Sequence, residues 1–205
     1  MSSPLANLRK FAGTKPGEQP PRRAPVEQCE LCAVRVPPQH RHLLEMPTLK
    51  IVCACDPCAL RFHDVVEGRF KLIPRDTRSL PEFKITDADW ENFALPINLA
   101  FLFHSTPHRK MMAYYPSPAG ATESLLPLTA WSSLVVQNPA LKDMQADVQA
   151  LLVNRAGKAR DYFIAPIDKC FELVGTIRMH WRGLSGGQEV WDKIDSFFSQ
   201  LKENA

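Results

Sequence analysis

Apolar residues recur at helical spacing in two segments near the end of the chain. In the segment after Pro166 they fall at i, i+3, i+4, i+7, i+10 and i+14, which places them on one face of a helix. These residues are Ile167, Cys170, Phe171, Val174, Ile177 and Trp181. The segment after Gly186-Gly187 repeats the pattern with Val190, Trp191, Ile194, Phe197, Phe198 and Leu201. The spacing therefore predicts two amphipathic helices.

Shorter apolar runs separated by turn residues predict strands in the middle of the chain. Residues 97–104 and 110–115 predict one hairpin around Ser105-Thr106-Pro107-His108. Residues 147–155 and 160–164 predict a second hairpin around residues 156–159. A helical period also fits part of this region. The residues in that alternative are Leu141, Met144, Val148 and Leu151.

A further short helix is predicted over residues 128–135, ending at Asn138-Pro139. Hairpins followed by segregated helices are typical of an α+β fold. We therefore expect an α+β domain over residues 75–205, with an antiparallel sheet and C-terminal helices. It follows a small module at residues 29–74.

Five of the six cysteines lie in that module. Cys29-Glu-Leu-Cys32 precedes Cys53-Ala-Cys55-Asp-Pro-Cys58. A C-x-x-C pair wraps two thiolates around one side of an ion, and two pairs complete the tetrahedral site of a structural zinc. Cys29, Cys32, Cys55 and Cys58 are therefore the predicted ligands of a zinc-ribbon-like module. Structural zinc contributes about 10–16 kcal/mol in small peptides, which is enough to fold such a segment.

Three neighbouring residues leave alternatives open. Cys53 is either a buried member of a strand over residues 51–53 or a ligand in place of Cys55. His40 and His42 share one face of an extended strand, where one of them could be a fourth ligand or a hydrogen-bond donor to a thiolate. Ordinary structural roles are the expectation for both histidines. The same holds for His63, His104, His108, His180 and the core thiol Cys170.

The identity of the metal is a choice between zinc and iron. Sulfur-rich tetrahedral sites suit both metals. A rubredoxin-like iron or a four-cysteine iron–sulfur cluster is therefore the alternative to Zn²⁺. Zinc is the prediction because no other feature of the sequence indicates a path for electrons.

Charge and composition narrow the range of partners and compartments. Lys+Arg 25 against Asp+Glu 22 gives a net charge of +3, which is too small to indicate nucleic-acid binding. No run approaches the ~18 apolar residues of a membrane span, and residues 1–28 lack the apolar core of a signal peptide. These proline-rich residues predict a flexible arm. We expect a cytoplasmic protein in which clustered cysteines bind metal.

Catalytic motifs are missing from the sequence. Leu184-Ser-Gly-Gly-Gln188 matches the signature peptide of ABC-type ATPases, but no phosphate-binding P-loop accompanies it. We interpret this segment as a glycine break with Ser185 as N-cap and Gln188 in capping-box spacing. Residues 115–120 predict a rigid, turn-rich loop and lack the hydrolase elbow G-x-S-x-G. The expectation is a protein that is not an enzyme.

Five short motifs occur in a fixed order along the chain. They are Cys29-Glu-Leu-Cys32, His40-x-His42-Leu43, Cys53-Ala-Cys55-x-x-Cys58-Ala59, residues 115–123 and residues 181–187. Together they resemble an uncharacterised bacterial domain family encoded among accessory genes of high-affinity uptake nickel–iron hydrogenases. The resemblance covers about residues 29–201. It implies a context in which the partner is a hydrogenase subunit or maturation factor.

The resulting hypothesis is a non-catalytic, zinc-binding accessory or assembly protein that binds another protein. The first alternative is a rubredoxin-like or iron–sulfur electron carrier in the same redox system. The second is a zinc-ribbon protein that binds nucleic acid, which the nearly balanced charge disfavours.

Overall fold

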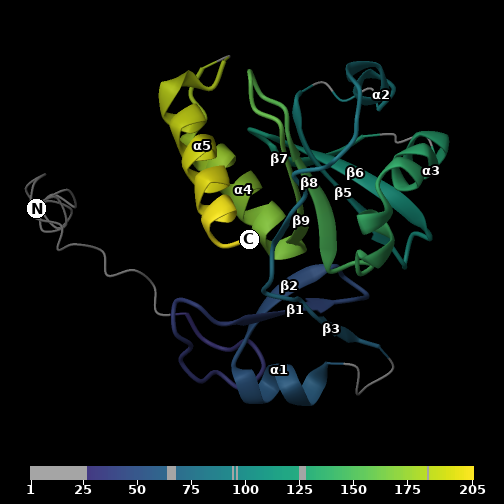
Figure 1. Cartoon of the computed structure of the whole chain (residues 1–205). Coiled ribbons are helices and arrows are strands. Elements are labelled where there is room, and N and C mark those ends of the chain that lie inside the picture. Colours follow the sequence, from purple (N-terminus) through teal and green to yellow (C-terminus); the bar gives the residue numbers. More distant parts are fainter. Residues whose placement is uncertain (1–26, 64–67, 94, 96, 125–127, 184) are drawn as a thin grey trace, which may run out of the picture.

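A computed structural model describes residues 27–63, 68–93, 95, 97–124, 128–183 and 185–205. Most of the predicted flexible arm, residues 1–26, lies outside these ranges. The described strands form two antiparallel sheets, one of three strands in the order β2-β1-β3 and one of six in the order β4-β9-β8-β5-β6-β7. The expected α+β fold is confirmed (Figure 1). No helix among the described residues has the length and apolar character needed to cross a membrane.

The three-stranded sheet and one short helix follow the first cysteine pair. Their bounds are β1 Arg41–Glu45, β2 Lys50–Ala54, α1 Asp56–Phe62 and β3 Phe70–Leu72. Because side chains alternate along a strand, β1 contributes to two cores. Leu43 packs in a small cluster with Val52, Ala54, Ala59 and Phe70. Leu44 points to the opposite face and belongs to the large core.

The six-stranded sheet contains both predicted hairpins. Its strands are β4 Arg78–Ser79, β5 Leu99–Ser105, β6 Lys110–Ser117, β7 Gly120–Ser124, β8 Gln149–Asn154 and β9 Asp161–Pro166. The β5–β6 and β8–β9 pairs are the expected hairpins. The helical alternative was wrong, because Leu141 lies in a short 3-10 helix, η3 (Pro139–Asp143), whereas Leu151 lies in strand β8. All six β8 residues are buried within the sheet, so the strand lacks the alternation that would have identified it.

Strand β7 was not predicted. The expected turn-rich loop is instead a hairpin in which Ser117 pairs with Gly120 across a two-residue turn. Pro116 can lie within β6 because the ladder between β5 and β6 ends at Tyr114. A residue without an N–H group is tolerated where no neighbouring strand requires its hydrogen bond.

Helices cover both faces of the six-stranded sheet. On one face lie α4 (Ile167–His180) and α5 (Gly187–Glu203), the two predicted C-terminal helices. The other face is covered by α2 (Asp87–Glu91), the predicted helix α3 (Leu128–Gln137) and η3. Figure 1 shows these layers on opposite sides of the sheet, with the three-stranded sheet at one end.

The alternation of β5 matches this arrangement. Phe101 and Phe103 belong to the core under α4 and α5, whereas Ala100 and Leu102 belong to the core on the opposite face. The chain therefore buries two apolar layers through one central sheet.

The start of α5 differs from the prediction. Gly186 is the N-cap, in the left-handed region with φ 87°, and no side chain of the described residues caps the helix. A Cβ atom on Gly186 would lie 2.7 Å from Val190 and 3.2 Å from Trp181, so both its backbone conformation and its packing require glycine. The predicted cap by Ser185 was therefore wrong. Its carbonyl instead accepts a hydrogen bond from Trp191 Nε1 at 3.2 Å.

Candidate metal centre

A tight turn positions the first cysteine pair. The backbone N–H of Cys29 donates to Val34 O, and the N–H of Ala33 donates to Cys29 O, both at 2.8 Å. Ala33 adopts a left-handed conformation with φ 61°, which reverses the chain directly after Cys32. The turn places Cys29 and Cys32 on one side of a narrow loop.

The second pair lies where β2 passes into α1. Cys55 is the N-cap of α1, and Pro57 lies in its first turn. The N–H of Ala59 donates to Cys55 O at 2.8 Å, which brings Cys58 round beside Cys55. The strand-to-helix transition thus forms the second C-x-x-C loop.

Glu30 joins the two pairs. Its N–H donates to Cys53 O at 2.9 Å, and its Oε1 accepts from the N–H of Cys53 at 3.0 Å. The other carboxylate oxygen forms an ion pair with Lys50. Hydrogen bonding to Lys50 and to the Cys53 N–H lowers the pKa of Glu30, so the carboxylate is charged at neutral pH.

The four predicted ligands converge. The Sγ atoms of Cys29, Cys32, Cys55 and Cys58 all lie within 4.8 Å of one another and could hold a metal ion. Cys32 Sγ and Cys55 Sγ are 3.7 Å apart. A tetrahedral ion with metal–sulfur bonds of about 2.3 Å requires sulfur atoms about 3.8 Å apart. A disulfide would need about 2.0 Å, and all four residues are free thiols.

The surroundings of Cys29 and Cys58 shift the pKa values of the two thiols in opposite directions. Burial would raise the pKa of Cys29, but backbone N–H groups of Cys55, Leu31 and Cys32 lower it to about 6. Burial and the neighbouring thiols Cys55, Cys32 and Cys29 raise the pKa of Cys58. Cys29 is therefore ready to bind a cation as a thiolate at neutral pH, and an ion in the centre of the cluster would favour the same form of its neighbours.

Cys53, His40 and His42 do not join this cluster. They form a second group of their own, with ligand atoms within 4.8 Å of one another. The geometry therefore does not place Cys53, His40 or His42 among the ligands of the four-cysteine cluster, as the alternatives had allowed. Spacing alone missed this group because Cys53 meets His42 through the register of two strands.

The remaining histidines and the sixth cysteine lie in other surroundings. His63 Nδ1 lies within hydrogen-bond distance of Ala59 O and Leu60 O at the end of α1. His180 Nδ1 lies 2.7 Å from Glu189 Oε1, and His108 Nδ1 lies 2.9 Å from Ser105 Oγ. Cys170 is fully buried in the large core.

Comparison with known proteins places the chain in a family. No curated protein and no solved structure shows a match to it. The family model described as "Family of unknown function (DUF5947)" matches residues 28–205, which include all four cysteines of the cluster. The chain therefore belongs to this family.

Proposed function

We propose that the chain is a zinc-binding accessory protein in which Cys29, Cys32, Cys55 and Cys58 hold one structural ion. The observation that supports this most strongly is the convergence of the four sulfur atoms, with a 3.7 Å separation between Cys32 and Cys55. Four thiolates fill the coordination sphere of zinc and leave no position for a catalytic water. The proposed role of this centre is therefore structural.

The small size of the neighbouring core supports a structural role. Among the described residues, five buried ones form the apolar cluster beside α1: Leu43, Val52, Ala54, Ala59 and Phe70. Such a cluster buries little apolar surface, and modules of this kind usually need a metal or disulfides. The proposed ion ties the turn at Cys29 and Cys32 to the start of α1.

A single ion fits the sulfur spacing better than an iron–sulfur cluster does. In a four-cysteine cluster the thiolates are shared among two or four irons, so the full set spreads farther apart than four ligands of one ion. One iron in the same four-sulfur site remains the second candidate, and the exposure of Cys32 favours it by giving electrons a short route to the surface. Such a protein would be coloured when oxidised and would bleach on reduction.

The proposed partner is another protein. Val34 and Leu60 are exposed large apolar residues on the two segments that supply the thiols. Apolar side chains at the surface of a small metal module are suited to burial against a partner. The sequence resemblance described above suggests a nickel–iron hydrogenase subunit or maturation factor, acting in the cytoplasm.

Elemental analysis of the purified full chain tests the metal. We expect zinc rather than iron, and the Cys58→Ser variant should lose one equivalent and expose the cluster around Leu43 to solvent. Cys170→Ser is the matched control, because it removes a thiol that lies in the large core outside the four-cysteine cluster, and it should leave the metal content unchanged. Full zinc content and unchanged folding in Cys58→Ser would refute the proposal.

Titration with purified hydrogenase subunits and maturation factors tests the partner. We expect one of them to bind, and Leu60→Glu should weaken binding at least tenfold. Val136→Glu, at another exposed apolar residue on α3, is the control and should leave binding unchanged. Binding by none of these proteins, or equal binding by Leu60→Glu, would refute this part of the proposal.

A further inference from the structure

Three potential metal ligands meet on the face of the three-stranded sheet opposite Leu43. His42 on β1 and Cys53 on β2 are directly paired across the strands. His40 lies two residues before His42 and projects to the same side. One imidazole nitrogen from each histidine and the Cys53 Sγ lie within 4.8 Å of one another. The two rings meet edge to face with centroids 4.6 Å apart.

Hydrogen bonds fix which nitrogen of each ring is available. His42 Nδ1 lies 2.7 Å from Asp168 Oδ2, and His40 Nδ1 lies 2.9 Å from Pro37 O. A carboxylate and a backbone carbonyl can only accept, so both Nδ1 atoms are the donors. In the neutral rings the lone pair is then on Nε2. This is the arrangement of metal-binding histidines, whose other nitrogen donates to a carboxylate or carbonyl.

The Nε2 atom of His40 is the clearest indication of a ligand. The side chain of His40 is only 4 % exposed, and its Nε2 is buried without a hydrogen-bond partner among the described residues. A buried acceptor left without a partner is costly. A cation bound beside Cys53 and His42 would satisfy it.

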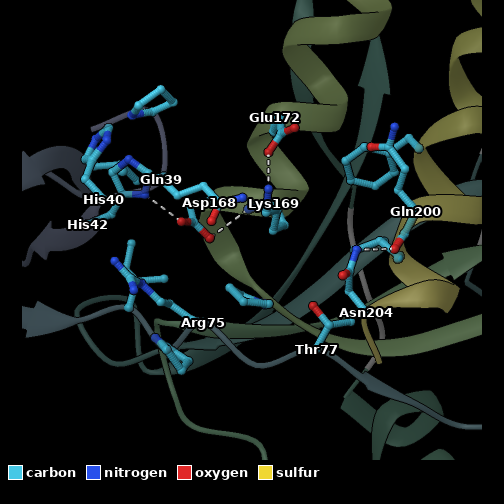
Figure 2. A pocket seen from close by; sticks show the side chains of 17 residues that line it. Gln39, His40, His42, Arg75, Thr77, Asp168, Lys169, Glu172, Gln200 and Asn204 are labelled. Atoms are coloured by element: carbon cyan, nitrogen blue, oxygen red, sulfur yellow. Dashed lines mark hydrogen bonds and ion pairs between the residues drawn. The ribbon is translucent and has the colours of Figure 1, made fainter. Parts of the chain in front are cut away.

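His40 and His42, but not Cys53, line a cavity of about 730 Å³. His40 and His42 form one end of it, together with Arg75 and Asp168, and Gln200 lines the far side (Figure 2). The cavity lies between the three-stranded sheet and the ends of α4 and α5. A ligand bound to the ion from this side would meet protein on several sides.

We propose that His40, His42 and Cys53 bind a second metal ion, separate from the four-cysteine centre. Two imidazoles and one thiolate suit a divalent transition metal such as Zn²⁺ or Co²⁺. Three protein ligands leave a fourth position for water or a small ligand from the cavity. Asp168 is a positioning residue, because it fixes the ring of His42 without being one of the three ligands.

Cobalt loading of the metal-free, reduced full chain tests this site. We expect two cobalt ions per chain after removal of unbound metal, and one in each of Cys53→Ser and His42→Gln. Both variants should keep the sulfur-to-cobalt absorption of the four-cysteine centre. Asp168→Asn should weaken binding of the second ion about 10–100-fold and leave the first unchanged.

His180→Gln is the matched control. His180 also pairs with a carboxylate, that of Glu189, at 2.7 Å, but lies outside the proposed site. This variant should bind two ions with unchanged affinity. One ion per chain in the unaltered protein, with no effect of Cys53→Ser or His42→Gln, would overturn the second site. Loss of both ions in Cys53→Ser would overturn the claim that the second site is separate from the four-cysteine centre. In either case the unaltered chain would still bind cobalt with the sulfur-to-cobalt absorption of the four-cysteine centre, and only loss of that absorption in the unaltered chain would count against the proposed function.

Discussion

Lys71 on β3 donates a hydrogen bond to Asp147, a fully buried carboxylate just before β8, and this ion pair links the two sheets. Asp147 also accepts from the N–H and the hydroxyl of Thr106, at 2.7 and 2.8 Å. Its φ of 71° places it in the left-handed region, where aspartate and asparagine are among the best tolerated residues. One side chain thus connects β3, the β5–β6 turn and β8.

Asp147→Asn tests this link, because it keeps the shape and removes the charge. We expect the free energy of unfolding in urea to fall by about 1–3 kcal/mol. This is less than for a fully buried pair, because Lys71 is partly exposed to solvent. Asp143→Asn, at an exposed position on η3, should change it by less than about 0.5 kcal/mol. Equal effects of the two substitutions would contradict the role of the ion pair.

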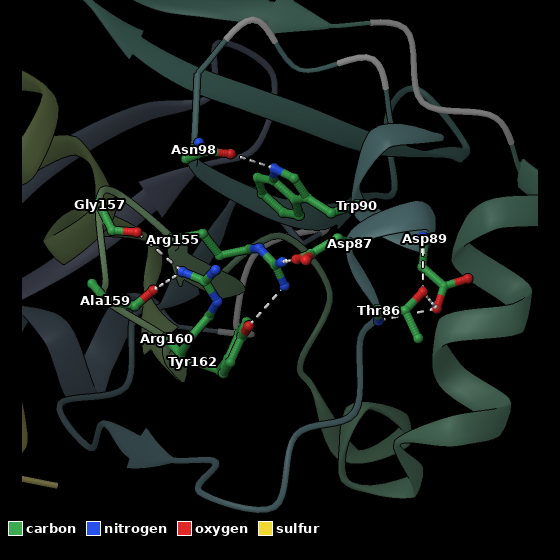
Figure 3. A network of polar contacts seen from close by, with 10 residues as sticks. All are labelled: Thr86, Asp87, Asp89, Trp90, Asn98, Arg155, Gly157, Ala159, Arg160 and Tyr162. Atoms are coloured by element: carbon green, nitrogen blue, oxygen red, sulfur yellow. Dashed lines mark hydrogen bonds and ion pairs between the residues drawn. The ribbon is translucent and has the colours of Figure 1, made fainter.

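The second prediction concerns Arg155, on the face of the six-stranded sheet that α2 and α3 cover. The buried guanidinium donates to Tyr162 Oη at 3.0 Å, pairs with Asp87 and lies 5.6 Å from the ring centroid of Trp90 (Figure 3). Arg155→Ala removes all three contacts and leaves the Tyr162 hydroxyl without this donor. We expect a loss of about 1–3 kcal/mol in thermal or urea unfolding.

Arg160→Ala is the control for Arg155. Arg160 is exposed, and within the part of the chain that the structure describes it donates to the nearby carbonyls of Gly157 and Ala159. Its removal should change stability by less than about 0.5 kcal/mol. If Arg155→Ala lowered the stability no more than Arg160→Ala does, the buried guanidinium would not hold α2 against the sheet.

The cap at the N-terminus of α2 predicts that the stability of the chain depends on pH. The hydroxyl of Thr86 donates a hydrogen bond to the carboxylate of Asp89, and so does the backbone N–H of Thr86. The hydroxyl has the larger effect, and together they lower the pKa of Asp89 below its usual value of 3.8. A carboxyl with a lowered pKa stabilises the fold above its unfolded-state pKa, and this contribution is lost as pH falls through the folded-state value. Asp89→Asn should therefore be less stable than the unaltered chain at pH 5, and the difference should shrink below about pH 4.

Urea unfolding of both proteins between pH 3 and pH 5 measures that difference. Acid affects thiolate–metal bonds equally in the two chains, so the comparison isolates the cap. Glu91→Gln, at an exposed position on the same helix, should show no such convergence. A difference that stays constant across this range would contradict the capping role of Asp89.

Metal removal predicts a local loss of structure. Because the cluster around Leu43 is small, chelation should speed amide hydrogen exchange in β1 and α1 by at least tenfold. Amides of β8, in the centre of the six-stranded sheet, should stay protected. Unchanged protection of β1 after complete removal of metal would contradict a structural role for the ion.

Local patterns predicted the parts of the fold that depend on short-range sequence. The helical periods after Pro166 and Gly186 and the turn around Thr106 each lie within one element or hairpin, so their apolar spacing is visible in the sequence. The same is true of the two C-x-x-C pairs. Strand β8 was ambiguous because a strand buried on both faces has no alternation.

Long-range contacts could not be predicted in this way. Asp168 lies 126 positions from His42, and only the tertiary arrangement brings the start of α4 beside β1. Asn138 was expected to end a helix, but its amide also exchanges hydrogen bonds with the backbone of Lys84, 54 positions away. Such partners depend on tertiary arrangement, which residue spacing does not encode.

X-ray absorption at the zinc edge tests the central claim most directly. Zinc-loaded Cys53→Ser is the appropriate sample, because it keeps the four-cysteine centre and lacks one ligand of the second site. The account predicts four sulfur neighbours at about 2.3 Å from the zinc and no nitrogen or oxygen neighbour. Fewer than four sulfur neighbours, or a chain that binds no zinc, would contradict it.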